Sequence, residues 1–111
     1  MDRNVEQPDQ ISLLARIKAR LEPVFGSRLR GVVLYGSEAR GEATPDSDVD
    51  ILVLLTGPVV LGQDLKTIIH ALYPLQLEMD RVLEAFPVDE TDFLQGDYAL
   101  HRQAREEGIR V

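Results

Sequence analysis

Two aspartates at the head of an apolar run are the residues of this sequence best suited to chemistry. Asp48 and Asp50 are two positions apart and are followed by Ile51-Leu-Val-Leu-Leu. Residues two apart in a strand project from one face, with Cα atoms about 6.6 Å apart. Two such carboxylates beside apolar neighbours are costly to hold without a cation, and Mg²⁺ prefers hard oxygen ligands. The pair therefore predicts a magnesium site; the alternative, an exposed loop pair, fits poorly with the buried strand that follows.

A turn suited to phosphate precedes this pair at Gly36-Ser37. Glycine lets the backbone approach an anion closely, N–H groups at a helix start point outward, and the Ser37 hydroxyl can donate to a phosphate oxygen. The pattern is weak by itself, because a strand-to-helix turn capped by serine explains it equally well. Together with Asp48 and Asp50, it predicts a bound nucleoside triphosphate.

Alternating strands and helices are predicted to position these residues. Residues 75–79 are ambiguous between helix and strand, and residues 41–47 have the composition of a loop. The order of elements predicts an α/β or α+β fold with a small mixed sheet flanked by helices. The predicted elements are a helix over Gln10–Glu22 capped by Asp9 and ended by Pro23 and Gly26, a strand over Leu29–Tyr35, a helical turn at Glu38–Arg40 capped by Ser37, a strand over Val49–Leu55, a helix over Gln63–Leu72 that Pro74 kinks or interrupts, a strand over Arg81–Val88, and a helical region from the cap Asp89 to Glu107.

The motif residues resemble the minimal nucleotidyltransferases of the polymerase β superfamily. Gly36-Ser37, ten intervening residues and Asp48-Val49-Asp50 are similar to the motif of that family. The resemblance extends more loosely over almost the whole chain and implies a polymerase β-like nucleotidyltransferase fold. Further motif positions fall where that family places them, namely Ala39, Arg40, Gly41, Ser47 and the apolar tail of the second strand.

The resemblance also implies roles for individual residues. Gly36 and Ser37 would bind the β- and γ-phosphates, with Arg40 and Ser47 as further nucleotide-binding candidates, while Asp48 and Asp50 would hold Mg²⁺. For Arg40 a salt bridge to a neighbouring acid of the loop (Glu38, Glu42 or Asp46) is an equal alternative.

A third carboxylate usually comes from the next strand of the sheet in this family. Glu84 is our first candidate for this catalytic and metal-binding position, with Asp80, or no third ligand at all, as alternatives. Two metals can stabilise the attacking oxygen and the leaving pyrophosphate in an in-line displacement at the α-phosphorus. The third carboxylate would accept the proton of the attacking hydroxyl.

Composition limits the partners of such a site. The chain has 111 residues, 44% of them hydrophobic and 28% charged, which suits one globular domain over residues 1–111. Its net charge of −7 opposes direct binding to nucleic acid and anionic membranes. There is no cysteine, and the first ten residues lack a basic segment followed by an apolar run, so we expect a cytoplasmic protein.

The resemblance implies transfer of AMP from ATP to a hydroxyl of another molecule. Similar proteins of this size are often the antitoxin half of a toxin–antitoxin pair, in which AMPylation of a tyrosine silences a HEPN-domain ribonuclease. A chain of 111 residues has little spare surface for an acceptor site, so a hetero-oligomer with such a partner is expected. The alternative is a binding protein of the same fold that neutralises its partner by contact, with weak or absent catalysis.

Overall fold

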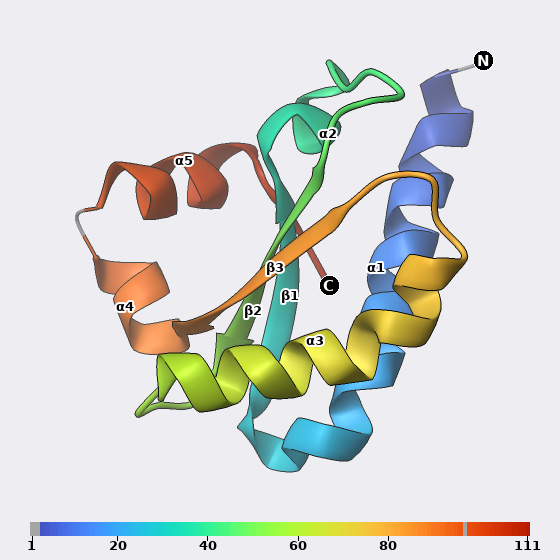
Figure 1. The fold of residues 1–111 in the computed structure, drawn as a ribbon. Helices are drawn as coiled ribbons and strands as arrows, with labels where there is room; N and C mark the ends of the chain where they lie inside the picture. Colours follow the sequence, from blue (N-terminus) through green and yellow to red (C-terminus); the bar gives the residue numbers. More distant parts are fainter. Residues whose placement is uncertain (1–2, 97) are drawn as a thin grey trace.

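A four-stranded mixed sheet organises the chain in the computed structural model, which describes residues 3–96 and 98–111. Its order is β3-β2-β1-β4, with β1 antiparallel to β2 and β4, and β2 parallel to β3. Figure 1 shows the sheet at the centre, between helices on both sides. The predicted mixed α/β architecture is thereby confirmed. The strands are β1 (Leu29–Tyr35), β2 (Val49–Leu55), β3 (Leu83–Asp89) and β4 (Ile109–Arg110).

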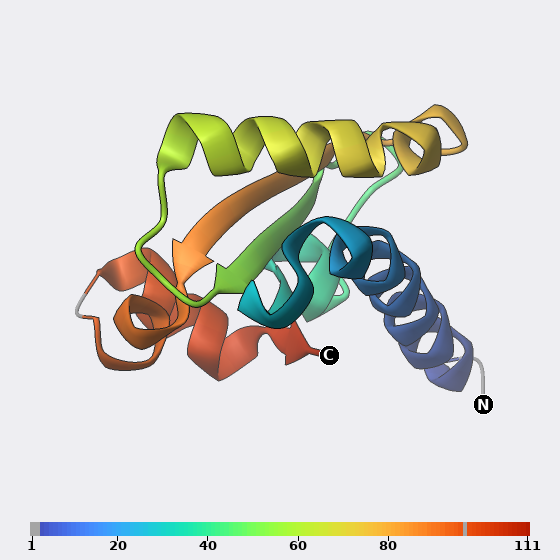
Figure 2. The ribbon, with the colours of Figure 1, turned by 90° about the horizontal axis from the view of Figure 1, so that it is seen from below.

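Helices of two layers cover the sheet. One layer packs its apolar stripes in the main core, and the other covers part of the opposite face. Seen from below in Figure 2, α3 and the pair α4–α5 lie on opposite sides of β2 and β3. The first layer consists of α1 (Arg3–Phe25) and α3 (Leu61–Leu77), the second of α4 (Glu90–Gln95) and α5 (Ala99–Glu107), and the short α2 (Gly36–Arg40) follows β1.

Alternation along the strands divides the core in two. The face of β1 and β2 that meets α1 and α3 carries odd-numbered side chains of β2, such as Ile51 and Val53. The other face carries Leu52 and Leu54, which pack with Val33 against α4 and α5. Strand β2 is thus buried on both faces beyond Asp50, which explains its nearly continuous apolar sequence.

Two helices of the first layer are longer than predicted. Helix α1 begins at Arg3 and runs through Pro23 to Phe25, so the prediction of Asp9 as its cap is wrong. Helix α3 begins at Leu61 and continues through Pro74 to Leu77, so Pro74 does not end it. Buried side chains on both sides of Pro74 carry the helix onward, whereas Pro74 itself is exposed. Tertiary packing overrides the local preference in this case.

The turn after β1 also differs from prediction. Helix α2 begins at Gly36, its N-cap residue is Tyr35, and no side chain caps it. The predicted cap Ser37 therefore lies inside the first turn. The reason is that Gly36 itself, with a φ of +74°, bends the chain from strand to helix at a backbone conformation that favours glycine.

The C-terminal part forms two helices and a strand instead of one helical region. Asp89 caps α4 as predicted, its side chain accepting from the N–H groups of Thr91 and Asp92. Gly96 ends α4, and α5 starts at Ala99. The short strand β4, which the sequence did not predict, pairs Ile109 with Leu34 of β1.

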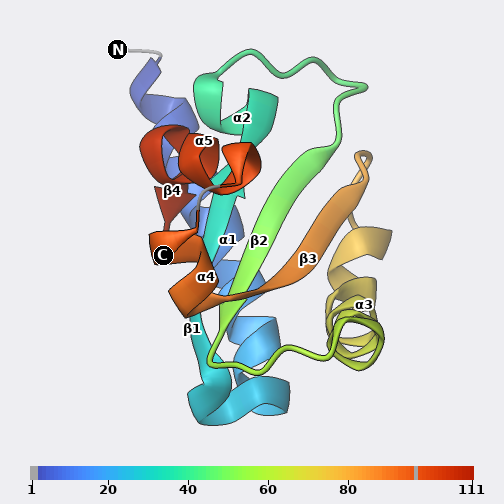
Figure 3. The same ribbon diagram turned by 90° about the vertical axis from the view of Figure 1, so that its left-hand side faces the viewer.

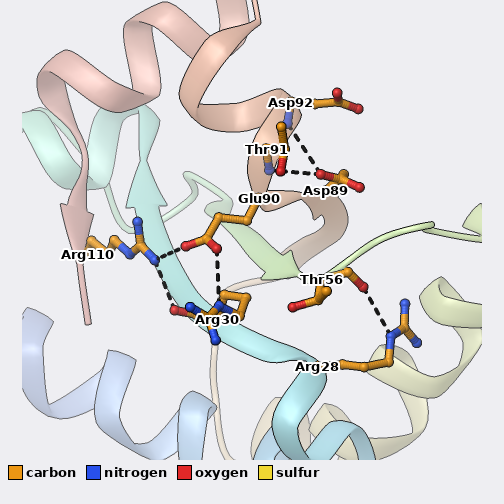
Figure 4. A network of polar contacts seen from close by, with 8 residues as sticks. All are labelled: Arg28, Arg30, Thr56, Asp89, Glu90, Thr91, Asp92 and Arg110. Carbon is orange, nitrogen blue, oxygen red and sulfur yellow. Dashed lines mark hydrogen bonds and ion pairs between the residues drawn. The ribbon is translucent and has the colours of Figure 1, made fainter.

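A cluster of ion pairs fastens this C-terminal part to the sheet. Glu90 of α4 accepts from Arg30 of β1 at 3.1 Å and from Arg110 of β4 at 2.7 Å, as Figure 4 shows. The two arginines lower the pKa of Glu90, Arg110 most strongly. These contacts hold α4 and β4 against β1. Within residues 3–96 and 98–111 no helix is both long enough and apolar enough to cross a bilayer.

Candidate functional site

Three neighbouring strands place an acidic cluster next to the turn at Gly36. Asp50 lies opposite Tyr35 in the β1–β2 ladder and beside Glu84 in the β2–β3 ladder. Asp48 acts electrostatically on both Asp50 and Glu84. The structure therefore brings Asp48, Asp50 and Glu84 together, at the end where β1 finishes and β2 and β3 begin. Asp80, the other candidate for the third carboxylate, lies exposed in the bend before β3.

The open face of the sheet makes these carboxylates accessible. Asp50 shares its face of β2 with Leu52 and Leu54, which α4 and α5 cover. Figure 3 shows α4 and α5 in front of β1, whereas the start of β2 and the ribbon of β3 are uncovered on that side. Glu84 is correspondingly exposed, and Asp50 is half-buried. The second helical layer thus ends before it reaches the acidic cluster.

Gly36 is the point where the turn meets the cluster. A Cβ placed on Gly36 would lie 2.5 Å from Oδ2 of Asp50, so no other residue fits there without displacing that carboxylate. The positive φ of +74° at Gly36 adds a backbone cost for any L side chain. The sequence predicted that the turn and the aspartates act together, and in the structure Gly36 lies directly against the Asp50 carboxylate.

Negative charge predominates in the acidic cluster. Burial, and then the charge of Asp48, raises the pKa of Asp50 against the opposing effects of Glu84 and Arg40. The charge of Asp48 is also the main cause that raises the pKa of Glu84, followed by burial and Asp50. Burial, with the charges of Asp50 and Glu84, raises the pKa of Tyr35 to about 12. Tyr35 therefore remains a protonated phenol beside the carboxylates.

The donor set of this cluster suits a divalent cation. Carboxylate oxygens that repel one another are stabilised by a cation between them, and Mg²⁺ usually takes one or two carboxylates plus water and phosphate oxygens. Asp48 and Asp50 supply two such groups, with Glu84 adjoining. Among residues 3–96 and 98–111 no three His, Cys, Asp or Glu side chains are arranged to enclose an ion by themselves. The remaining ligands would have to come from phosphate and water.

The other predicted nucleotide-binding side chains have protein partners in the structure. Arg40 forms ion pairs with Glu42 at 2.9 Å and with Glu107 at 3.4 Å, so the predicted salt-bridge alternative is present. The Ser47 hydroxyl accepts from the Thr44 N–H at 2.9 Å and closes the loop before Asp48. Arg40 remains near enough to act on Asp50, whereas the Ser47 hydroxyl serves the loop.

The sequence did not predict the Arg81 network, a set of polar contacts among Arg81, Glu38, Ser47 and Gln10. Arg81 pairs with Glu38 at 2.6 Å and donates to the carbonyl of Ser47 at 2.7 Å. The buried amide of Gln10 donates to the carbonyl of Glu38 at 2.7 Å. These contacts tie α1, α2 and the start of β3 to the loop that ends at Asp48. Opposite charges far apart in sequence gave no local signal for the pairing.

A cavity of about 430 Å³ adjoins the Arg81 network, between α1 and the loop after α2. Its lining contains none of the three clustered carboxylates. Since the hard oxygen donors lie on the open face of the sheet, we place the candidate active site on that face instead of in the cavity.

Comparison with known proteins identifies the family of this chain. A mixed sheet that joins a glycine turn to acidic side chains on the next two strands is what the resemblance to the minimal nucleotidyltransferases implied. Residues 14–107 match the family described as nucleotidyltransferase domain, and the chain belongs to this family. Two candidate protein adenylyltransferases of Methanocaldococcus jannaschii are similar to it. One is 33% identical over 89 residues, covering 79% of this chain and 83% of the relative; the other is 31% identical over 70 residues, covering 62% and 71%.

Solved structures share the fold at low sequence identity. A toxin–antitoxin complex with AMP-PNP has a TM-score of 0.59 at 18% identity, covering 86% of this chain and 69% of that chain. A candidate nucleotidyltransferase from Sulfolobus solfataricus has a TM-score of 0.58 at 21% identity, covering 95% and 84%. These likenesses establish the nucleotidyltransferase fold.

The raised pKa values predict how stability depends on pH in metal-free buffer. A carboxyl whose pKa is raised in the folded state destabilises that state while ionised, and this penalty is relieved as pH falls through the raised pKa. Asp50→Asn is therefore expected to melt at a higher temperature than wild type at neutral pH. The difference should shrink as pH falls toward the usual Asp value of 3.8. Thermal melts of both proteins between neutral pH and that value check this, and a variant less stable than wild type at neutral pH would contradict it.

Proposed function

We propose that this chain is a Mg²⁺-dependent nucleotidyltransferase that transfers AMP from ATP to a hydroxyl of a partner protein. The observation that carries the proposal is the contact distance between the Gly36 turn and the Asp50 carboxylate, with Glu84 on the next strand. In this proposal Asp48 and Asp50 hold the metal, Glu84 adjoins it, and Gly36 and Ser37 bind the β- and γ-phosphates. Bound Mg²⁺ would offset the negative charge of the triphosphate and of the cluster.

The proposed reaction assigns separate tasks to the side chains. The acceptor oxygen forms a bond to the α-phosphorus, the bond from that phosphorus to the bridging oxygen breaks, and pyrophosphate leaves. Glu84, whose raised pKa suits a general base, takes the proton of the hydroxyl. The N–H groups at the start of α2 receive the phosphates of the leaving group, and Arg40 can exchange the carboxylates of Glu42 and Glu107 for phosphate.

The proposed partner is the toxin of a toxin–antitoxin pair, with a tyrosine as acceptor. Solved structures of this fold include a toxin–antitoxin complex with AMP-PNP and a second complex named MntA-HpeT, and the relatives in Methanocaldococcus are named as adenylyltransferases that act on protein. The resemblance in the motif points to a HEPN-domain ribonuclease. The acidic surface of this chain, with a net charge of −7, favours a protein partner over nucleic acid.

Transfer of label from ATP to the proposed toxin, sought as the product of the neighbouring gene, tests the proposal. Purified wild type, Mg²⁺ and α-labelled ATP should yield AMP-labelled toxin, and Asp48→Ala/Asp50→Ala should not. Toxin neutralisation in cells separates catalysis from contact. If the double variant still neutralises the toxin, contact carries the biological effect; if wild type labels no toxin, the chain is not an adenylyltransferase of that partner.

Nucleotide binding predicts a thermal shift. A ligand that binds only the folded state stabilises it by about 2.7 kcal/mol at a concentration 100 times its Kd. ATP together with Mg²⁺ should therefore raise the melting temperature of wild type by several degrees, and Asp50→Asn should abolish the rise. Differential scanning fluorimetry with ATP alone, Mg²⁺ alone and both together checks this. Equal curves under all three conditions would count against a nucleotide site completed by this chain alone.

A further inference from the structure

An exposed phenylalanine lies beside the acidic cluster without a place in the proposed site. Phe86 is 43% exposed although it lies in the middle of β3. The side chains of β3 alternate, with Ala85 and Pro87 buried on the α3 face, so Phe86 shares the opposite face with Glu84. Its partner in the ladder is the buried Leu52. An apolar ring is therefore presented on the open face, two residues beyond the proposed general base.

The order of the strands determines from which side an acceptor reaches this face. In an in-line displacement the attacking oxygen enters opposite the leaving group. The proposed phosphate turn follows β1, the aspartates belong to β2, and Glu84 belongs to β3. If pyrophosphate leaves toward Gly36, the acceptor arrives across β3. This strand is an outer strand of the sheet described for residues 3–96 and 98–111, and Figure 3 shows its ribbon uncovered on this face.

We propose that Phe86 is a specificity-determining residue that packs against the aromatic ring of a phenolic acceptor. This inference rests on the proposed function. The ring of a tyrosine is bonded directly to its hydroxyl, so an oxygen delivered to Glu84 brings the ring to the next side chain on the same face, which is Phe86. Serine and threonine place no ring there and gain nothing from the contact. Phe86 thereby selects tyrosine among protein hydroxyls, because aromatic pairs add stabilisation beyond the burial of their area.

Binding of a minimal acceptor tests this contact independently of turnover. The probe is N-acetyl-tyrosinamide, titrated by NMR into the full chain loaded with Mg²⁺ and AMP-PNP, with N-acetyl-serinamide as the non-aromatic comparison. The chain has three phenylalanines, which makes the Phe86 ring signals assignable. Tyrosinamide should shift the Phe86 signals, and Phe86→Ala should weaken its binding roughly three- to tenfold. Phe86→Leu keeps the apolar surface but not the ring. Its affinity for tyrosinamide should lie between those of wild type and Phe86→Ala.

A matched control and a second measurement keep the outcomes distinct. Tyr73→Ala removes an aromatic side chain that is 58% exposed on α3, in the other helical layer, and should leave tyrosinamide binding unchanged. Tyrosinamide that binds no better than serinamide, or equally well to Phe86→Ala, overturns the role of Phe86. So does a Phe86→Ala variant that weakens AMP-PNP instead, because the ring would then stack on the base. If tyrosinamide binds as expected but no AMP is transferred to any acceptor, the proposed function is wrong, whereas the contact of Phe86 with the phenol ring stands.

Discussion

Replacing Asp50 by asparagine should lower the rate of AMP transfer roughly 10²- to 10³-fold, which is typical for loss of one preorganised electrostatic contact in an active site. Asparagine preserves the size of the side chain in its half-buried place on β2, so the protein should remain folded. The charge that would hold the metal is lost, and the neighbouring Glu84 loses only the smaller part of the repulsion that raises its pKa, because the larger part comes from Asp48. Single-turnover transfer of labelled AMP, with ATP and Mg²⁺ saturating for wild type, measures the effect.

Asp80→Asn is the matched control for Asp50→Asn. It removes the same charge from an exposed residue in the bend before β3, near the cluster along the chain. Because the ladder places Glu84, and not Asp80, beside Asp50, this variant should transfer AMP at the wild-type rate. Loss of activity in Asp80→Asn, with activity kept in Glu84→Gln, would show that the third carboxylate has been assigned to the wrong residue.

The local part of the site was predictable because it lies within one short segment of sequence. The bounds of β1 and β2 were predicted as observed, since both are largely apolar runs, with Gly36 directly after the first and Asp48 directly before the second. The pairing of Asp48 with Asp50 follows from the two-residue period of a strand. Their contact with Gly36 follows once β1 and β2 pair as antiparallel neighbours, which makes the turn and the aspartates meet at one end.

The parts that depend on distant packing were not predictable in the same way. The choice of Glu84 over Asp80 requires the register of β3 against β2, and a shift of one residue would turn Glu84 to the other face. The return of β4 to β1, and the ion pairs of Glu90 with Arg30 and Arg110, join residues far apart in sequence. The exposure of Phe86 depends on where α4 and α5 stop covering the sheet. Neither local propensity nor periodicity contains this information.

Gly36→Ala should reduce AMP transfer by roughly 10²-fold, the typical cost of misplacing a reacting group by about 1 Å. The added Cβ would stand 2.5 Å from Oδ2 of Asp50, so the carboxylate or the turn must move. The variant also adopts a positive φ with a side chain, a backbone penalty of roughly 1–2 kcal/mol. Gly41→Ala separates the two effects, because Gly41 has a φ of +73° and no atom within 4 Å of its Cβ position. Chemical denaturation and labelled-AMP transfer on both variants should show a loss of stability in each, at least as large in Gly36→Ala, but loss of transfer only in Gly36→Ala. Equal transfer by the two variants would mean that the approach of Asp50 to the turn is irrelevant to catalysis.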